Sequence, residues 1–263
     1  MYAFEYKRPA SVKDAVSSAA GDARFLAGGQ SLVQSMRLRL ASNPTLVDLG
    51  GIAELRAIQV DGHAVTIGAM ATHASVARSR EVANAIPALA ELAAGIGDPM
   101  VRNMGTIGGS IANADPAADY PAAVVGLDAT IQTDRRSIPA ADFFKGLFET
   151  ALQPGEMIRS VSFPIVRQAA YQKLRQPASR FALVGVFAAN GPNGPRVAVT
   201  GAGPSVFRVT EMENALKSRF AADAIAGIQV PSAGLNSDLH GSAEYRAAMI
   251  GVMAQRAVAA ASR

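Results

Sequence analysis

The segment GTIGGSIANADPAADYPAA, Gly105–Ala123, combines three glycines and two prolines with small side chains. The adjacent glycines, Gly108 and Gly109, stand between the hydroxyl-bearing residues Thr106 and Ser110. Glycines leave main-chain N–H groups open to close approach by another molecule, and phosphates bind to such groups. The segment therefore predicts a place where bare backbone contacts a ligand.

A second glycine pair lies upstream in FLAGGQSL, Phe25–Leu32, where an apolar strand turns into a helix. Gly28 and Gly29 permit positive φ, and the helix that begins near Ser31 adds free N–H groups and the positive end of its dipole. These features suit a phosphate or a pyrophosphate, although a tight turn with no ligand has the same pattern. The spacing lacks the third glycine of GxGxxG, which disfavours a Rossmann dinucleotide site.

Together, the two glycine segments favour one extended dinucleotide lying between them. In a flavin dinucleotide the pyrophosphate needs N–H donors, which we expect from residues 106–110. The ribityl and ribose hydroxyls need acceptors, for which Asp119 is the candidate. Asp115 directly precedes Pro116 and is interpreted instead as the start of a helix.

The residue types limit the chemistry of this chain. It has no cysteine, which excludes disulfides, thiolate catalysis, cysteine-bound zinc and an iron–sulfur cluster held by the chain itself. The three histidines, His63, His73 and His240, lack the spacing of metal ligands. No histidine or carboxylate pair forms a candidate acid–base site. We therefore predict no metal site and no catalytic residue.

Charge and hydropathy indicate the cellular setting. The net charge is +4, but the basic residues are scattered and aromatic residues make up only 6%. Nucleic-acid binding would require a clustered basic patch with interleaved aromatics. Glu91 interrupts the apolar stretch AIPALAELAAGIG, and Glu5 and Lys7 stand where a signal peptide would be apolar. We expect a cytoplasmic protein without a membrane span or a nucleic-acid partner.

Patterns along the chain predict an α+β fold. Residues 10–50 read as helix, strand, helix and strand, with a second helix over SLVQSMRLRL and a candidate parallel pairing of the two strands. Two alternating runs about Asp61-Gly62 predict a β-hairpin. Beyond residue 166, two strands joined by GPNGP precede helices. We assign residues 1–166 to a first domain with subdomains of about 1–55 and 56–166, and residues 167–263 to a C-terminal α+β domain.

Four segments, in this order and at this spacing, resemble the flavin-binding medium subunit of the molybdenum hydroxylases. This group comprises xanthine dehydrogenase, aldehyde oxidoreductase and aerobic carbon monoxide dehydrogenase. The resemblance covers essentially the whole chain, and its specificity lies in the combination of motifs. The segments are AGGQSL, TIGGSIANADPAADYPAA, IPAADFFKGLFETAL with GEMI, and AYQKLRQPASRFALVGV.

The resemblance implies FAD held in a two-part domain of the vanillyl-alcohol-oxidase (PCMH) type, followed by a small C-terminal α+β domain. It also implies a complex, in which a large subunit carries molybdopterin and hydroxylates the substrate, and a small subunit carries [2Fe–2S] clusters. This chain would take electrons from those clusters to its FAD and pass them to an external acceptor. The lack of cysteine agrees with a chain that relays electrons without holding a cluster.

The resemblance further implies which residues contact FAD. Lys173 falls near the flavin ring, where an ammonium would stabilise the anionic reduced flavin; an exposed lysine at the start of a strand is the alternative. Ile96 and Ile158 fall on apolar contacts with the flavin, with core packing as the alternative. The implied contacts are Leu26, Ala27, Gly28, Gly29, Gln30, Ser31, Leu32, Ile96, Thr106, Ile107, Gly108, Gly109, Ser110, Asp119, Ile158 and Lys173.

Several questions stay open at this level. A stand-alone FAD-dependent oxidase or dehydrogenase and a basic interaction module without flavin are the alternative functions. After Lys173 the chain reads RQPASRFALV, which lacks the Lys-Arg and Asp pattern of some carbon monoxide dehydrogenases and disfavours that substrate. Tyr171 and Phe181 are candidate aromatics at the flavin ring. Met100, Val101 and Met104 form a candidate subunit contact, with core packing as the alternative.

Overall fold

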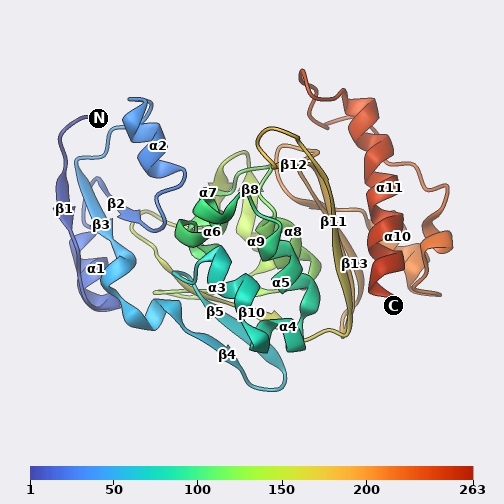
Figure 1. Cartoon of the computed structure of the whole chain (residues 1–263), viewed down its shortest axis with the longest axis horizontal. Coiled ribbons are helices and arrows are strands. Elements are labelled where there is room, and N and C mark those ends of the chain that lie inside the picture. Colours follow the sequence, from blue (N-terminus) through green and yellow to red (C-terminus); the bar gives the residue numbers. More distant parts are fainter. Residues whose placement is uncertain (263) are drawn as a thin grey trace.

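The computed structural model describes residues 1–262. Three sheet-containing parts follow one another along the chain and across the molecule, from the blue N-terminal part at the left of Figure 1 to the red C-terminal part at the right. Within residues 1–262, no helix combines the length and the apolar character that a membrane crossing requires.

The N-terminal part confirms the predicted parallel unit, because β3 lies between β1 and β2 and is parallel to both. The helix α2 is shorter than its apolar pattern predicted. Arg39 takes a left-handed φ of 61°, and the N–H of Leu40 donates to the carbonyl of Ser35 at 2.9 Å, which closes the helix. The elements are β1 (Glu5–Lys7), α1 (Val12–Ser18), β2 (Ala23–Leu26), α2 (Leu32–Arg37) and β3 (Thr45–Asp48).

The central part is built on an antiparallel sheet of order β4-β5-β10-β6-β7, and the predicted hairpin about Asp61-Gly62 is confirmed as β4 and β5. Short helices pack together over this sheet, with α7 against β5 and β10 (Figure 1). The strands are β4 (Ile58–Val60), β5 (Ala64–Gly68), β6 (Thr130–Thr133), β7 (Ser137–Pro139), β8 (Phe144–Gly146), β9 (Glu149–Thr150) and β10 (Ile158–Pro164). The helices are α3 (His73–Arg78), α4 (Arg80–Ala85), α5 (Pro87–Ala94), α6 (Pro99–Met104), α7 (Ile107–Asn113), α8 (Tyr120–Gly126) and α9 (Ala140–Phe143).

The C-terminal part is a four-stranded antiparallel sheet covered on its outer face by the long helix α11 (Figure 1). The strands expected around GPNGP are confirmed as the paired β12 and β13. The elements are β11 (Gln168–Arg175), β12 (Ala182–Gly191), β13 (Gly194–Thr200), β14 (Phe207–Arg208), α10 (Thr210–Leu216) and α11 (Ala243–Ala261).

The strand β12 is buried on both faces. Val184 and Val186 belong to the cluster that packs under α11, whereas Phe187 and Ala189 belong to the core of the central part. Because side chains alternate along a strand, this one element contributes to two hydrophobic cores. The C-terminal sheet therefore also forms a wall of the central part.

Candidate functional site

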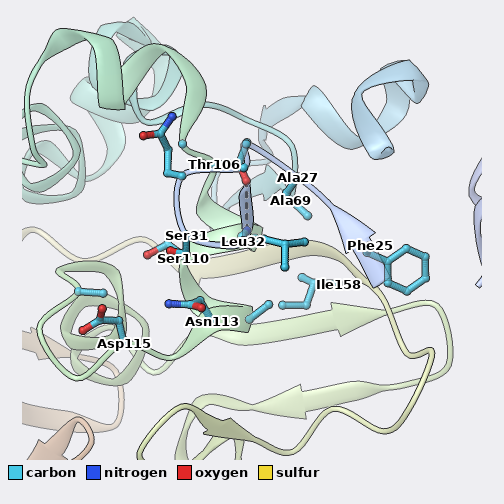
Figure 2. Close-up of a pocket in the computed structure, with 18 of the residues that line it drawn as sticks. Phe25, Ala27, Ser31, Leu32, Ala69, Thr106, Ser110, Asn113, Asp115 and Ile158 are labelled. Atoms are coloured by element: carbon cyan, nitrogen blue, oxygen red, sulfur yellow. Dashed lines mark hydrogen bonds between the residues drawn. The ribbon is translucent and has the colours of Figure 1, made fainter. Parts of the chain in front are cut away.

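A cavity of about 550 Å³ opens between the N-terminal and central parts and reaches the loop between β11 and β12. Figure 2 shows Phe25 and Asp115 at opposite ends of the view, with Ser31, Thr106 and Ser110 between them. The cavity thus extends to both sides of the two glycine segments, as an elongated ligand would require.

The first glycine segment lies in the loop between β2 and α2, as predicted. Gly29 has a left-handed φ of +71°, which glycine adopts without strain. Within residues 1–262, the N–H groups of Gly28, Gly29, Gln30 and Ser31 donate to no main-chain or side-chain acceptor. The hydroxyl of Ser31 also caps nothing. This loop therefore offers several unused donors at the cavity wall.

The second glycine segment is the first turn of the helix α7, and its N–H groups are already bonded within the chain. The N–H of Gly108 donates to the carbonyl of Ala69 at 2.9 Å. The N–H of Gly109 donates to Oγ1 of Thr106 at 3.1 Å, the dashed line in Figure 2. Ile107 and Ser110 likewise donate to carbonyl oxygens, at 3.1 and 3.0 Å. These four N–H groups therefore have partners within the chain, and the role of this segment as a pyrophosphate contact stays a prediction.

Close packing explains the glycines around this second segment. A Cβ on Gly108 would lie 2.5 Å from the Cβ of Ala69. A Cβ on Gly28, in the first segment, would overlap the carbonyl oxygen of Met104 and lie 2.9 Å from the Cα of Gly105. The two segments are therefore in direct main-chain contact, and this contact joins the N-terminal part to the central part.

A buried ion pair lies behind the cavity. Nζ of Lys173 lies 2.9 Å from Oδ1 of Asp119 and also donates to the carbonyl of Gly95 at 3.1 Å. The hydroxyl of Tyr171 donates to the same carboxylate at 2.5 Å. Burial raises the pKa of Asp119, and the ammonium of Lys173 acts against this rise. Asp119 lines the cavity, whereas Lys173 and Tyr171 stand behind it.

His73 is a cavity residue that the sequence did not indicate. The residue is 5% exposed, and its main-chain N–H donates to the carbonyl of Gly105 at 2.9 Å. Burial, with a smaller contribution from Arg102, lowers the pKa of its imidazole to about 4, so the ring is neutral at pH 7. Nδ1 of His73 and the hydroxyl of the neighbouring Tyr120 are buried without a partner in residues 1–262.

Most of the residues predicted to contact a flavin line this one cavity. Three of them, Leu26, Ile107 and Lys173, do not line the cavity. The alternative interpretation of Lys173 as a surface residue was also wrong, since its side chain is only 4% exposed. Those that line the cavity are Ala27, Gly28, Gly29, Gln30, Ser31, Leu32, Ile96, Thr106, Gly108, Gly109, Ser110, Asp119 and Ile158.

Other expectations have mixed outcomes. Asp115 does not start a helix: its Oδ1 accepts the N–H of Ala117 at 2.9 Å in a turn, and α8 begins later, at Tyr120. Phe181 lines the cavity. Met100 and Met104 are exposed, by 80% and 57%, so core packing does not explain them. Their role as a subunit contact stays a prediction.

Further residues line the cavity that were not predicted to contact FAD, apart from Phe181, which was a candidate aromatic at the ring. Phe25, Met70, His73, Phe148, Arg180 and Phe181 are among them. These residues come together only because β2, α3, the β8–β9 hairpin and the β11–β12 loop meet in space. A short sequence pattern does not predict such a meeting. Phe148 and Arg180 have a local feature, a left-handed φ of 54° and 63°, and that is visible only in the structure.

The cavity suits an extended dinucleotide. The loop over Gly28–Ser31 provides unused N–H groups for a diphosphate, and its residues line the cavity. Hollow space continues on both sides of this loop, toward Phe25 and toward Asp119. An FAD molecule has this layout, with a diphosphate between two ring systems, so the residues present fit that cofactor.

Comparisons with known proteins identify the family. Residues 2–166 match the family model described as the FAD binding domain in molybdopterin dehydrogenase. The chain belongs to this family of FAD-binding medium subunits of molybdenum hydroxylases. Its FAD-binding domain is followed by a region of sheet and helix, and the chain is a subunit of a molybdenum-containing dehydrogenase complex.

Relatives of this medium subunit align over nearly their whole length. The carbon monoxide dehydrogenase medium chain of Hydrogenophaga pseudoflava is 36% identical, covering 98% of this chain and 96% of the relative. The nicotine 6-hydroxylase medium subunit of Paenarthrobacter nicotinovorans is 33% identical, with 97% and 96% covered. The structure of reconstituted CO dehydrogenase from Oligotropha carboxidovorans superimposes with a TM-score of 0.89 at 34% identity, covering 100% of this chain and 99% of that chain.

Proposed function

We propose that this medium subunit holds FAD in the described cavity, with the diphosphate at the loop Gly28–Ser31. The observation that carries this proposal is the set of N–H groups in that loop without a partner in residues 1–262. Phosphate oxygens are strong acceptors and bind to such main-chain donors. The hydroxyls of Ser31 and Ser110, which line the same cavity, add donors on either side.

We place the flavin ring at the Asp119 end of the cavity and the adenine toward Phe25. Ile96 lines the ring end as an apolar surface, and Asp119 offers a carboxylate whose position is fixed by Lys173. Figure 2 shows Ile158 nearer to Phe25, so it serves as an apolar surface of the cavity away from that end. The ring end also carries the exposed Phe148 and Phe181. It is therefore the end that we expect to be accessible to an electron donor or acceptor. The Phe25 end is walled by the N-terminal part.

We infer that the chain relays electrons within a complex. Bound FAD supplies redox chemistry, and the chain binds and orients it. The proposed partners are a small subunit with [2Fe–2S] clusters, which delivers electrons, and a large molybdopterin subunit, which hydroxylates the substrate. A related CO dehydrogenase structure is described as lacking the Mo-pyranopterin moiety of its molybdenum cofactor, which supports the presence of that cofactor in related complexes. The electrons then pass to an external acceptor.

The proposed fold within the family is the two-part vanillyl-alcohol-oxidase (PCMH) type, with subdomains of about 1–55 and 56–166 and a C-terminal domain of 167–263. Three hydrophobic clusters support this division, because each draws most of its members from one part. Met70 and Met157 of the central part join the N-terminal cluster, and Phe187 and Ala189 of the C-terminal part join the central one. The cavity lies where the first two meet.

Purification of the full chain alone and with its partner subunits tests the proposed function. We expect a yellow chain with flavin absorbance, and co-purification with an iron–sulfur chain and a molybdenum chain. FAD in the complex should be reduced by substrate of the large subunit, and FAD in the isolated chain should not. A colourless chain would contradict FAD binding, whereas reduction of FAD by a substrate in the isolated chain would favour a stand-alone dehydrogenase.

A further inference from the structure

Three basic side chains donate to carbonyl oxygens of the turn Gly95–Gly97 after α5, at the wall of the cavity, and a fourth, Arg175, lies beside Gly95 without such a bond. Lys173 donates to the first carbonyl oxygen of this turn at 3.1 Å. Arg102 donates to the second and third at 2.8 and 3.1 Å. Arg180 reaches the third at 3.4 Å, the longest of these contacts. The three cations differ in what else holds them.

Lys173 and Arg102 are occupied within the chain. The ammonium of Lys173 pairs with the carboxylate of Asp119, is shielded from solvent and does not line the cavity. Arg102 is half-buried, does not line the cavity, and points its guanidinium at the two carbonyl oxygens. The Lys173–Asp119 pair is neutral as a unit, so it presents little net charge to a ligand.

Arg180 is the cation that remains available. It is exposed, lines the cavity and makes no ion pair with any residue in 1–262. Among the described residues, Arg24 is the other permanently charged cation at the cavity wall, and it lies on β2 in the N-terminal part. Arg175, the last residue of β11, also acts electrostatically on Asp119 but does not line the cavity. Among the described residues, Arg180 is therefore the cation that brings an unpaired positive charge to the cavity surface at the Asp119 end.

The loop that carries Arg180 is built as a tight turn. The N–H of Gln176 donates to the carbonyl of Phe181 at 2.9 Å, and the N–H of Arg180 donates to the carbonyl of Gln176 at 2.8 Å. The N–H of Ser179 donates to Oε1 of Gln176 at 2.6 Å. Arg180 itself has a left-handed φ of 63°. These bonds fix the backbone that presents Arg180 and Phe181 to the cavity.

We propose that Arg180, rather than Lys173, is the residue that electrostatically favours the reduced flavin in this chain. The proposal rests on the proposed function, because it requires FAD with its ring at the Asp119 end. Two electrons and one proton convert oxidised FAD to an anion, FADH⁻, with its charge near N1. An unpaired guanidinium at that end stabilises the anion more than the neutral oxidised ring and so raises the reduction potential.

The test compares single-charge variants of the full chain loaded with FAD. The measurement is the midpoint potential against a reference dye, with dithionite as the electron source. In Arg180→Gln we expect the preference for reduced over oxidised flavin to fall about tenfold, which is about 30 mV for a two-electron couple. Arg180→Lys keeps a charge and should retain most of the potential. Arg167→Gln makes the same change in net charge at an exposed residue outside the cavity and should leave the potential unchanged.

The outcomes are distinct. If Arg180→Gln retains FAD at the wild-type potential, or if Arg167→Gln lowers the potential equally, the role of Arg180 is overturned. If Lys173→Met lowers the potential as much as Arg180→Gln is expected to, the role belongs to Lys173. Should Arg180→Gln bind FAD weakly, the ratio of dissociation constants for oxidised and reduced FAD gives the same quantity. Failure of the wild-type chain to bind FAD would refute the proposed function instead.

Discussion

The two glycine pairs look alike in the sequence and differ in the structure. Both stand close to hydroxyl-bearing residues. The pair Gly28-Gly29 lies in a true loop, with a left-handed glycine and N–H groups that have no partner in residues 1–262. The pair Gly108-Gly109 lies inside α7, where the N–H groups are bonded to Ala69 and Thr106. The first segment offers N–H donors to a ligand. The second segment packs against the first and holds it in place.

This difference shows that a glycine can be required for opposite reasons. At Gly29 the backbone conformation demands it, and at Gly108 the nearness of Ala69 does. Gly28 is the point at which the two segments touch, because its Cα hydrogen faces the main chain of Met104 and Gly105. Substitutions at these positions should therefore separate loss of ligand donors from loss of packing.

Gly28→Ala should have the largest effect. Its Cβ would overlap the main-chain oxygen of Met104, so the N-terminal and central parts must separate at the cavity. We expect a loss of about 3 kcal/mol in stability and about 100-fold in FAD affinity. Thermal unfolding and FAD titration measure the two losses. Wild-type FAD affinity in this variant would show that the contact between the segments does not matter.

Acidification should act through His73, which packs against Gly105. Its folded pKa of about 4 lies below the ordinary value of 6.5, so the unfolded chain takes up the proton first. Its contribution to stability is therefore complete above pH 6.5 and is lost as the pH falls toward 4, up to about 3 kcal/mol. Denaturant unfolding from pH 7 to pH 4 measures this, and His73→Asn should flatten the slope. Equal slopes in both proteins would rule out His73 as the cause.

Gly29→Ala tests the loop conformation. A left-handed alanine costs about 1 to 2 kcal/mol, and its Cβ would lie 2.9 Å from Cγ2 of Val33. Because the free N–H groups depend on this conformation, FAD affinity should fall more than unfolding stability does. Parallel calorimetry and FAD titration make the comparison. A drop in stability with unchanged affinity would mean that the loop does not bind the diphosphate.

Thr106→Val should have the smallest effect and the opposite profile. The substitution removes the hydroxyl that caps α7 through Gly109, which costs about 1 kcal/mol of stability. The N–H groups of this helix start are not assigned to the diphosphate, so FAD affinity should change by less than about threefold. A large loss of affinity at unchanged stability would show that the second segment binds the diphosphate directly.

Local patterns predicted much of the fold. The parallel pairing of β2 and β3, the hairpin at Asp61-Gly62 and the strands around GPNGP all follow from alternation and turn residues. The end of α2 was missed because the apolar pattern continued to Leu40, while left-handed Arg39 closes the helix. An arginine at that position carries no sequence signal for a helix end.

The site was predictable where residues are close in sequence and not where they are distant. The first glycine loop and Asp119 line the cavity as expected. His73 and Arg180 gave no local signal, since the cavity forms only when α3 and the β11–β12 loop meet the glycine segments. Lys173 was placed at the ring by resemblance, but whether its charge is free depends on Asp119 and Gly95, which are far from it in the sequence.

The two-sided burial of β12 bears on how the chain can be divided. The match to the FAD-binding family ends at residue 166, which suggests a natural place to truncate. However, Phe187 fills the central core from beyond that point, so close to Gly126 that a Cβ added there would lie 2.8 Å from Cδ1 of its ring. An expressed fragment of residues 1–166 would expose this apolar surface and should aggregate. The smallest unit able to fold by itself is accordingly longer than the segment that defines the family.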